Sequence, residues 1–488
     1  MKDLFFKLKG FYLSNRRWID LSIAILLCAF GMIAPALAFV ALVGFLVLLA
    51  FNDFNNGLML ICFISPFCAV LRVFGGDVVF VACLAFFAVK YLIIALKNKQ
   101  IVYEPQSWLP FLALCVFMIL PIGVINGKKI LYTGLVVLGV ALVFVATLNL
   151  KEIKIREVSI SLVVGLLVAC AFSTILFEIP NANAIVQQTP LGKGFRYSAL
   201  FANPNHLSEY CAIVLSIFVY RFFSEKLRVE NFCFAAVVTI IGMLSGSKSF
   251  MLIAIVLFGA ITIVGIRDCL KFDRFKKAML YSSPVIAIAI GLMIYVFLKR
   301  SGVFDGNFGI DSLTTGRQVI WQNALSLVGR NGFTFLFGLG MGSEIQTPPP
   351  NNYNSTHNIY IEFFQKLGII GFALFVLVIA QFMVRETKNK PFKKYWHSLI
   401  PLFTIAAYGI VESMLNNSSV MILIPLAFII FAIGVSNCPN KTDSLDDNKD
   451  AQNGRLKNHK DNQQDTLLSQ NAGDSVDKWV DVLNQNND

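Results

Sequence analysis

Long apolar stretches, each able to cross a lipid bilayer, recur along this chain between Trp18 and Val435. The hydrocarbon core of a bilayer is about 30 Å thick, so a helix of about 20 apolar residues can span it. Inside lipid, every backbone N–H and C=O must be paired within the protein, and an α-helix pairs them locally. The sequence therefore predicts an all-α, polytopic membrane protein with about 12 to 14 transmembrane helices.

Composition agrees with this prediction. Hydrophobic residues make up 56% of the 488 positions and charged residues only 14%, so water cannot be the main solvent of the chain. Several apolar segments are short or interrupted by proline, and the expected number of crossings is therefore a range. The segments are 19–34, 36–51, 55–72, 78–97, 108–125, 130–149, 158–177, 207–223, 231–245, 249–266, 279–298, 358–384, 397–413 and 418–435.

Short clusters of lysine and arginine beside these segments indicate the orientation of the chain. Cytoplasmic loops of membrane proteins carry an excess of these two residues. Each cluster follows an even number of predicted crossings, so we expect all of them, and both termini, to be cytoplasmic. The clusters are Lys7/Lys9/Arg16/Arg17, Lys97/Lys99, Lys151/Lys154/Arg156, Arg221/Lys226/Arg228, Arg267/Lys271/Arg274/Lys276/Lys277 and Arg385/Lys388/Lys390/Lys393/Lys394.

The same topology divides the chain into three parts. Residues 1–177 are expected to form an N-terminal transmembrane bundle, and residues 178–436 a second membrane region with a long exterior loop at 299–357. Residues 437–488 are rich in Asn, Asp, Lys and Gln and are expected to be a disordered cytoplasmic tail.

The exterior loop has a helical pattern of its own. Its apolar residues predict a helix over 314–330, with Thr315 as the N-cap, lying on or near the bilayer surface. The apolar positions of this helix are Val319, Ile320, Ala324, Leu325 and Val328.

Several classes of function lose support. The formal charge of +12 does not indicate nucleic acid, because the lysines and arginines lie beside membrane segments and the tail is acidic. The ten cysteines lie mostly within apolar stretches and form no Cys-x-x-Cys pair, so we interpret them as buried apolar residues. The sequence has no G-x-x-x-x-G-K-[ST] or H-E-x-x-H motif, which removes the simplest signs of ATP hydrolysis and zinc chemistry.

Two predicted outward loops carry a cation in a polar setting. In one, Arg196 can present a guanidinium fork to a phosphate, while Asn203 and Asn205 flank a proline turn that can start a helix. Glu209 lies just inside that helix. In the other, Lys248 stands in a Ser/Gly turn whose N–H groups favour anions, on the side where positive charge is scarce. The plainer interpretations are an ordinary helix start and a solvated lysine.

The exterior loop and the segment after it carry further candidates. Arg317, in the first turn of the predicted helix, can point at an anion beside the helix N-terminus. Trp321 follows it, and the glycine-rich run 337–342 is most simply a flexible loop. His357, followed by Asn358 at the mouth of the next apolar segment, suits activation of a hydroxyl, although interfacial histidines that only bind water are common.

The candidates are more informative together than singly. If their four separate loops converge, three cations and one proton-transfer group share a pocket, and such a pocket suits a pyrophosphate leaving group. The four residues are Arg196, Lys248, Arg317 and His357.

These residues belong to motifs that resemble a known family. The motifs are the run F-R-Y-S-A-L-F-A-N-P-N, the turn S-G-S-K-S, the helix T-G-R-x-x-x-W followed by F-G-x-G, and the segment H-N-x-Y-x-E-x-x-x-x-x-G ending at Gly368. In this order they are similar to bacterial O-antigen ligases and polymerases over about residues 180–435. The resemblance implies a GT-C-type, metal-independent, inverting glycosyltransferase without a cofactor, working at the periplasmic or extracellular face of the bacterial plasma membrane.

The resemblance also implies partners and roles. The donor would be a glycan on undecaprenyl pyrophosphate within the membrane lipid, and the acceptor a lipid A-core sugar or a growing chain. Arg196 and Arg317 would neutralise the pyrophosphate, and His357 would activate the acceptor hydroxyl. Lys248 stands where the family often carries arginine, which keeps the charge but loses the bidentate fork. The residues expected to bind substrate are Lys248, Asn203, Asn205, Glu209, Trp321 and Asn358.

Other functions remain open at this point. A ligase and a repeat-unit polymerase share the same motifs and differ in their acceptor. A flippase for lipid-linked glycans would instead predict an internal repeat and charges in midplane helices, and neither is evident. A membrane scaffold with a docking tail would leave the four candidate loops without a role.

Overall fold

The computed structural model describes residues 2–71, 78–98, 113–114, 117, 153–175, 186–188, 195–201, 203–224, 228–269, 317–340, 343, 356–387, 396–410 and 412. The chain divides into two units, 1–386 with 396–437 and 387–395 with 438–488, and the described residues other than Thr387 all belong to the first. The expected tail, 437–488, lies outside the described residues.

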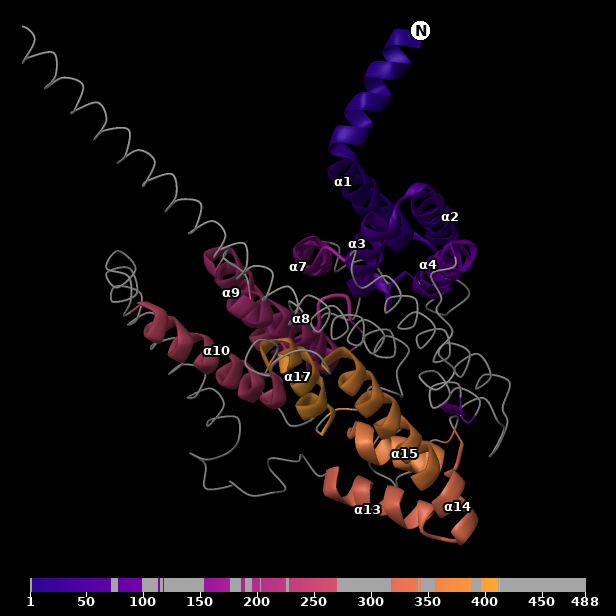
Figure 1. The fold of residues 1–488 in the computed structure, drawn as a ribbon, viewed down its shortest axis with the longest axis vertical. Helices are drawn as coiled ribbons and strands as arrows, with labels where there is room; N and C mark the ends of the chain where they lie inside the picture. The colour runs from indigo at the N-terminus through magenta and orange to yellow at the C-terminus, as the bar shows by residue number, and fades with distance from the viewer. Residues whose placement is uncertain are drawn as a thin grey trace, which may run out of the picture. The chain divides into compact units, whose positions relative to one another are not determined.

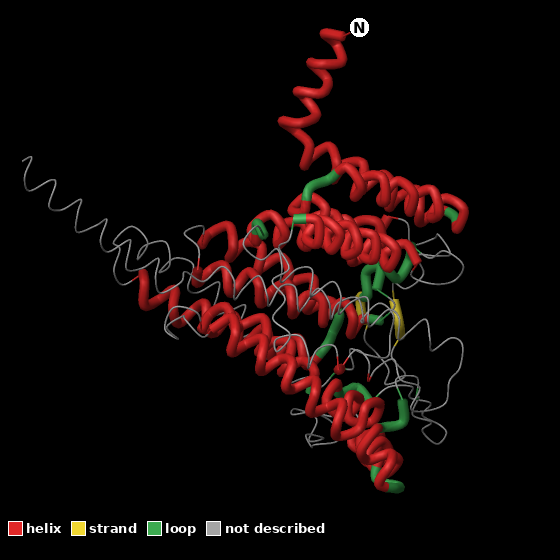
Figure 2. Tube along the Cα trace, turned by 45° about the vertical axis from the view of Figure 1, so that its right-hand side comes forward, coloured by secondary structure: helices red, strands yellow, loops and turns green. Residues whose placement is uncertain are grey.

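The described residues are almost all helical (Figures 1 and 2). The N-terminal elements are α1 (Lys2–Ile33), α2 (Pro35–Phe51), α3 (Phe54–Ile64), η1 (Ser65–Phe67), α4 (Val78–Lys97) and α7 (Ile155–Ile175). The later elements are β1 (Val186–Gln188), β2 (Phe195–Tyr197), α8 (Pro204–Ser224), α9 (Arg228–Leu244), α10 (Lys248–Cys269), α13 (Arg317–Val328), α14 (Gly332–Phe337), α15 (Ile359–Thr387), η4 (Trp396–Leu399) and α17 (Ile400–Gly409).

Four of the described helices are long and apolar enough to cross a membrane: α4, α7, α8 and the part of α15 from Ile359 to Leu377. This confirms an all-α polytopic membrane protein, and α4 begins and ends where the sequence predicted its segment. The expected 12 to 14 crossings stay a prediction, because segments 130–149, 279–298, 418–435 and most of 108–125 lie outside the described residues.

Polar residues end the early helices. Lys90 of α4 donates from Nζ to the carbonyls of Leu49, Ala50 and Asn52 at 2.8, 3.0 and 2.6 Å, which satisfies the C-terminal carbonyls of α2. Asp53 then starts α3 by accepting a hydrogen bond from the N–H of Asn56 at 2.8 Å. A cation within an apolar helix thus stabilises the junction between two neighbouring segments.

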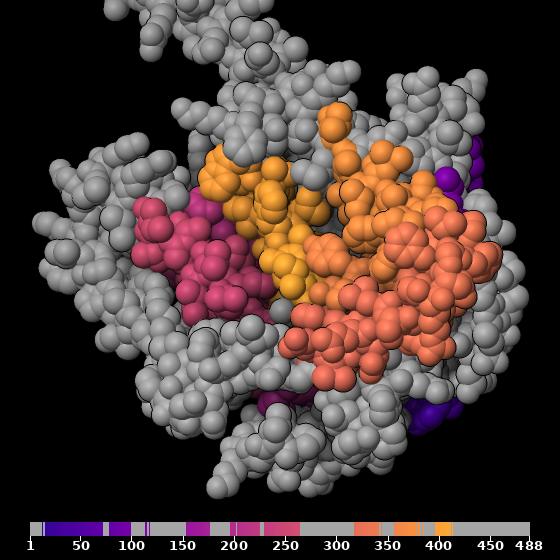
Figure 3. Space-filling view, turned by 90° about the horizontal axis from the view of Figure 1, so that it is seen from below, coloured from indigo at the N-terminus to yellow at the C-terminus, as the bar shows by residue number. Residues whose placement is uncertain are grey.

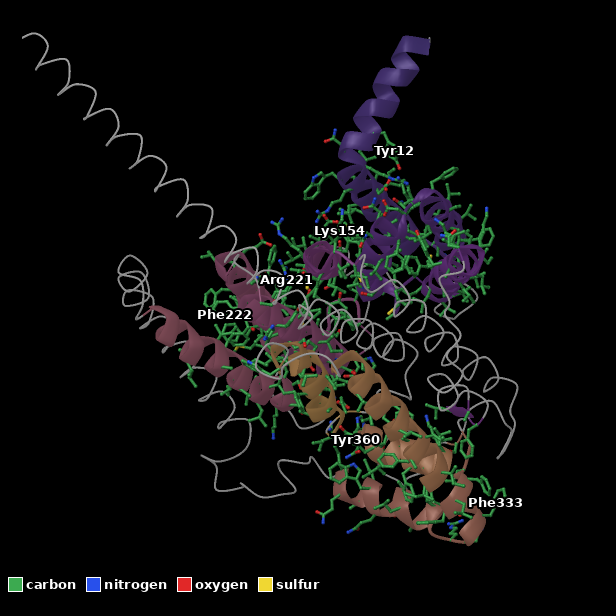
Figure 4. The ribbon with its side chains drawn as sticks, viewed as in Figure 1. Tyr12, Lys154, Arg221, Phe222, Phe333 and Tyr360 are labelled. Atoms are coloured by element: carbon green, nitrogen blue, oxygen red, sulfur yellow. The ribbon has the colours of Figure 1, made fainter. Side chains whose placement is uncertain are left out.

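Of the four described helices that can cross a membrane, α8 is the most enclosed. It packs against α9, α10, α17 and α7 (Figure 1), and 89% of its apolar window is buried, compared with 44–50% for the other three candidate spans. Near its C-terminal end, Arg221 (Figure 4) is fully buried and donates to the hydroxyl of Ser159 at 2.8 Å. It also pairs with Glu230 at 3.4 Å, so these polar groups join α7, α8 and α9.

A short antiparallel hairpin precedes α8. Strand β1 pairs with β2 (Figure 2). In this pairing, Gln187 lies opposite Arg196. The hairpin fixes the backbone on which Arg196 stands, a few residues before α8 begins.

Helix α13 confirms that the predicted segment 314–330 is helical over Arg317–Val328 but corrects its buried face, and its exterior placement stays a prediction. Ile320, Ala324 and Val328 are buried, whereas Val319 and Leu325 are 59% and 45% exposed. The buried residues are spaced by four and so share one face, while the other two point away from it. The expected N-cap, Thr315, lies outside the described residues. Figure 3 shows α13 and α14 beside α15, with α17 next to α15.

Candidate functional site

The carboxylate of Glu412, just beyond the end of α17, joins residues from three other parts of the chain. Its Oε2 lies 2.7 Å from Nδ1 of His357, and its Oε1 lies 3.4 Å from Nη2 of Arg317. Oε1 also accepts a hydrogen bond from Nδ2 of Asn205 at 2.5 Å. The Glu412 side chain is only 7% exposed, compared with 24% for His357 and 17% for Arg317. The site is therefore a half-buried charged cluster with its carboxylate on the inside.

Arg196 reaches the same cluster through Asn205. Its Nη2 donates to Oδ1 of Asn205, and its Nε donates to the carbonyl of Ser245 at 2.8 Å, in the turn before α10. Because Asn205 in turn donates to Glu412, one hydrogen-bonded path connects Arg196 with the carboxylate. The structure thus brings together Arg317, His357 and the pair Arg196 and Asn205, which the sequence placed on three separate loops.

The backbone at His357 is held in an unusual conformation. Its φ of 49° lies in the left-handed region, which few residues other than glycine adopt. The flanking residues hold it there. The carbonyl of Thr356 accepts a hydrogen bond from Nε1 of Trp321 at 2.8 Å, and the hydroxyl of Thr356 donates to the carbonyl of Asn358 at 2.8 Å. The turn thereby aims the imidazole at Glu412.

Asn358 connects α15 with α17. Its Oδ1 accepts hydrogen bonds from the N–H groups of Tyr360 and Ile361, both at 3.0 Å, as an N-cap does. Its Nδ2 donates to the carbonyl of Ile410 at 2.9 Å. Tyr360 (Figure 4) adds a bond from its hydroxyl to the carbonyl of Ala406 at 2.9 Å. Asn358 and Trp321, which the sequence proposed as substrate-binding residues, therefore make contacts that position His357.

The remaining candidates lie around the start of α8 and α10. Oδ1 of Asn203 accepts a hydrogen bond from the N–H of Asn205 at 2.8 Å and helps to start α8. Lys248 is the first residue of α10 and is half-buried. Glu209 is fully buried in α8, and within the described part of the chain neither of its carboxylate oxygens has a hydrogen-bond partner. Substrate contact by these three residues stays a prediction.

Sequence reasoning missed Glu412, the residue on which the cluster converges. It lies at the end of the apolar segment 397–413, outside the motifs that drew attention to the other residues. A signal was present, because Glu412 is the single acidic residue between 397 and 418 and stands at a predicted membrane boundary. An ionisable residue in such a position is costly and is often functional.

The surroundings of Glu412 set its charge. The carboxylate is largely buried, yet it lies 2.7 Å from Nδ1 of His357 and 3.4 Å from Nη2 of Arg317, and it accepts a hydrogen bond from Asn205. A nearby guanidinium and hydrogen-bond donors favour the ionised form of a carboxyl group. An ionised acceptor at 2.7 Å favours the tautomer in which Nδ1 of His357 carries the proton and Nε2 presents a lone pair.

The fold and the site together define a polytopic membrane protein in which arginines, a histidine and a carboxylate from distant segments form one cluster. Comparison with protein families finds a match over part of the chain. Residues 233–376 match the family described as O-antigen ligase, so the chain contains a region of that family, and the resemblance to O-antigen ligases and polymerases is confirmed. The matched region runs from α9 into α15 and includes Arg317 and His357. No curated protein matches the chain.

Proposed function

We propose that this protein transfers a glycan from undecaprenyl pyrophosphate to a hydroxyl of an acceptor sugar at the outer face of the plasma membrane. The observation that carries the proposal is the contact of one carboxylate, Glu412, with both His357 and Arg317, at 2.7 and 3.4 Å. A histidine and two arginines within one hydrogen-bonded cluster supply what displacement of a pyrophosphate needs, a base and positive charge. The family match supports the same class of reaction.

The reaction needs one bond to form and one to break. The acceptor oxygen attacks the anomeric carbon of the donor glycan, the bond from that carbon to the pyrophosphate oxygen breaks, and the electron pair leaves with the pyrophosphate. Nε2 of His357 takes the proton of the acceptor hydroxyl. A single displacement inverts the anomeric configuration and requires no metal. The charge that develops on the leaving pyrophosphate is stabilised by Arg196 and Arg317, which therefore act mainly in the transition state.

Glu412 acts through its neighbours and is a positioning residue. Its Oε2 keeps the proton of His357 on Nδ1 and stabilises the imidazolium that forms during the reaction, as a carboxylate does in other histidine-based sites. Its Oε1 holds Arg317 and Asn205 at the same time. One side chain thus aligns the base with the groups that neutralise the leaving group.

Two versions of this proposal differ in the acceptor. A ligase transfers the glycan to a lipid A-core sugar or another non-carrier acceptor, and we favour this version; a polymerase transfers it to another carrier-linked repeat unit. The surface glycan of a mutant that lacks the gene distinguishes the two versions. Long chains stranded on the carrier lipid indicate a lost ligase, and single repeat units on the acceptor indicate a lost polymerase.

The substitutions His357→Ala and Arg317→Ala test the chemistry. Each should abolish glycan transfer in membranes at an unchanged protein level, because one removes the base and the other removes charge that stabilises the leaving group. The readout is the surface glycan on a gel. His397→Ala and Arg330→Ala are matched controls, since His397 stacks on Tyr220 and Arg330 is exposed, away from Glu412 contacts. Unchanged glycan in both test variants would exclude this site.

A further inference from the structure

Helix α15 is interrupted at Gly368, and the interruption receives another segment of the chain. Gly368 has φ 64° and ψ −170°, which are not helical angles. Carbonyl groups just before a helix break lack helical partners and must be satisfied elsewhere. Here the N–H of Leu339 donates to the carbonyl of Gln365 at 2.8 Å, and the N–H of Gly340 donates to that of Lys366 at 2.9 Å. The glycine run after α14 is therefore bound to α15 at these residues, which the simple interpretation as a flexible loop did not anticipate.

Two glycines make this approach possible. A Cβ on Gly338 would lie 2.5 Å from the nitrogen of Gly368 and 2.5 Å from the carbonyl carbon of Lys366. A Cβ on Gly368 would in turn lie 2.5 Å from the nitrogen of Gly338 and would collide with the carbonyl of Leu336. Both glycines also have positive φ, 76° and 64°, which disfavours any side chain. Each glycine thus fits only because the other has no side chain.

Residues of α13 and α14 contact α15 and the turn before it at three further places. Nε1 of Trp321 donates to the carbonyl of Thr356, and Ile320 of α13 packs in a small apolar cluster with Ile361. The rings of Phe335 and Phe364 meet edge to face, with centroids 5.6 Å apart. Residues from Thr356 to Gly368 therefore contact α13, α14 or the glycine run after α14. The contact between Gly338 and Gly368 is the last of these along α15.

We propose that Gly338 and Gly368 are positioning residues for the transfer reaction, which makes this inference rest on the proposed function. Arg317 is the first residue of α13, and His357 lies two residues before α15. The two side chains contact opposite oxygens of Glu412, so their separation depends on how α13 and α14 are seated on α15. The glycine pair fixes that seating and thereby sets the leaving-group arginine relative to the base.

The test compares alanine at each glycine with alanine at a neighbouring glycine that has room for it. Gly338→Ala and Gly368→Ala should each lower kcat for transfer by about 100-fold, the loss expected from a displacement of about 1 Å in a catalytic group. Gly332→Ala is the matched control, because nothing lies within 4 Å of its Cβ position. The full-length protein in proteoliposomes is assayed with undecaprenyl pyrophosphate-linked glycan extracted from the source cells, and folded protein is quantified by gel filtration.

A double-mutant cycle separates positioning from a general loss of folded enzyme. If Gly338 acts through Arg317, then adding Gly338→Ala to Arg317→Lys should lower kcat by less than about tenfold further, because coupled residues are not additive. A folding defect would instead multiply with Arg317→Lys by the full factor, and that result would overturn the proposal, as would wild-type rates in both glycine variants. If the wild-type protein transfers no glycan, the proposed function itself is rejected. If the wild type is active and both glycine variants transfer at the same rate, only the positioning role is rejected.

Discussion

Glu412 is the residue on which the largest number of candidate side chains converge, and its two oxygens have separable partners. Oε2 contacts only the ring of His357 among the contacts described above, while Oε1 is shared by Arg317 and Asn205. A change that keeps the shape of the side chain and removes its charge therefore isolates its effect on the histidine tautomer.

Glu412→Gln should lower kcat by roughly 100-fold or more, because a neutral amide no longer fixes the proton on Nδ1 or stabilises the imidazolium. The protein should remain folded, since an amide oxygen can still accept hydrogen bonds from Asn205 and Arg317. Transfer rates of the purified full-length variant provide the measurement. Glu157→Gln, which alters the ion pair of Glu157 with Arg17, serves as the control. A Glu412→Gln enzyme with an unchanged rate would show that the carboxylate is not needed to orient His357.

The residue scale also shows what the sequence could reveal. Arg196, Arg317 and His357 were recognisable because their motifs resemble a family, and the structure brings them into one cluster. Glu412 lacks such a motif and was found only when the fold placed it beside them. The positive φ of His357 could not be predicted either, since it follows from hydrogen bonds between residues far apart in the chain, such as Trp321 and Thr356.

At the scale of elements, the start of α15 holds the site together through Asn358. The side chain caps α15 with one atom and reaches the carbonyl of Ile410 with another, so it joins the segment of His357 to that of Glu412. A cap that also bridges two helices should matter more than a cap on an isolated helix.

Asn358→Ala should reduce stability by about 0.5–2 kcal/mol through loss of the cap, and transfer should fall as well because α17 loses a contact. Asn358→Asp keeps an oxygen for the cap but has no donor for Ile410, so it should recover the thermal stability more than the activity. The measurements are Tm in detergent and the transfer rate. Asn331→Ala, which removes the cap of the short helix α14, provides a comparison outside the bridge. Equal activity losses in the Asn358 and Asn331 variants would argue against the bridging role.

Helix boundaries were predictable where the extent of an apolar run alone decides them. The limits of α4 match the expected segment 78–97, and α15 begins one residue from its expected start. The break at Gly368 was not predicted, because a glycine within an apolar run is tolerated by helices and its partner, Gly338, is remote in sequence. The exposure of Val319 was misjudged for a related reason: several apolar stripes fit one short helix, and only packing selects among them.

At the scale of the whole molecule, the orientation in the membrane is the prediction on which the proposed function depends most. The positive-inside pattern places Lys154 in the cytoplasm and the exterior loop with Arg330 outside. Both residues are exposed in the structure and so suit chemical labelling.

Single cysteines provide the test, in a background in which all ten native cysteines are replaced by alanine. Arg330→Cys should react with a membrane-impermeant maleimide in intact spheroplasts, whereas Lys154→Cys should react only after permeabilisation. The reason is that a charged reagent cannot cross the hydrocarbon core. Labelling of both cysteines in intact spheroplasts, or of Lys154→Cys alone, would contradict the expected topology and with it the outward placement of the site.

The enclosure of α8 by other helices has a consequence for how the molecule can vary. A helix that faces lipid, such as the exposed side of α2 with Phe39, Val40 and Val43, can exchange one apolar residue for another with little effect on its neighbours. Helix α8 is instead surrounded by other helices of the protein. Its polar residues Ser208 and Arg221 form hydrogen bonds with residues on those helices. We therefore expect substitutions on α8 to occur together with compensating changes on α7 and α17, so that covariation is concentrated in a helix that has little contact with lipid.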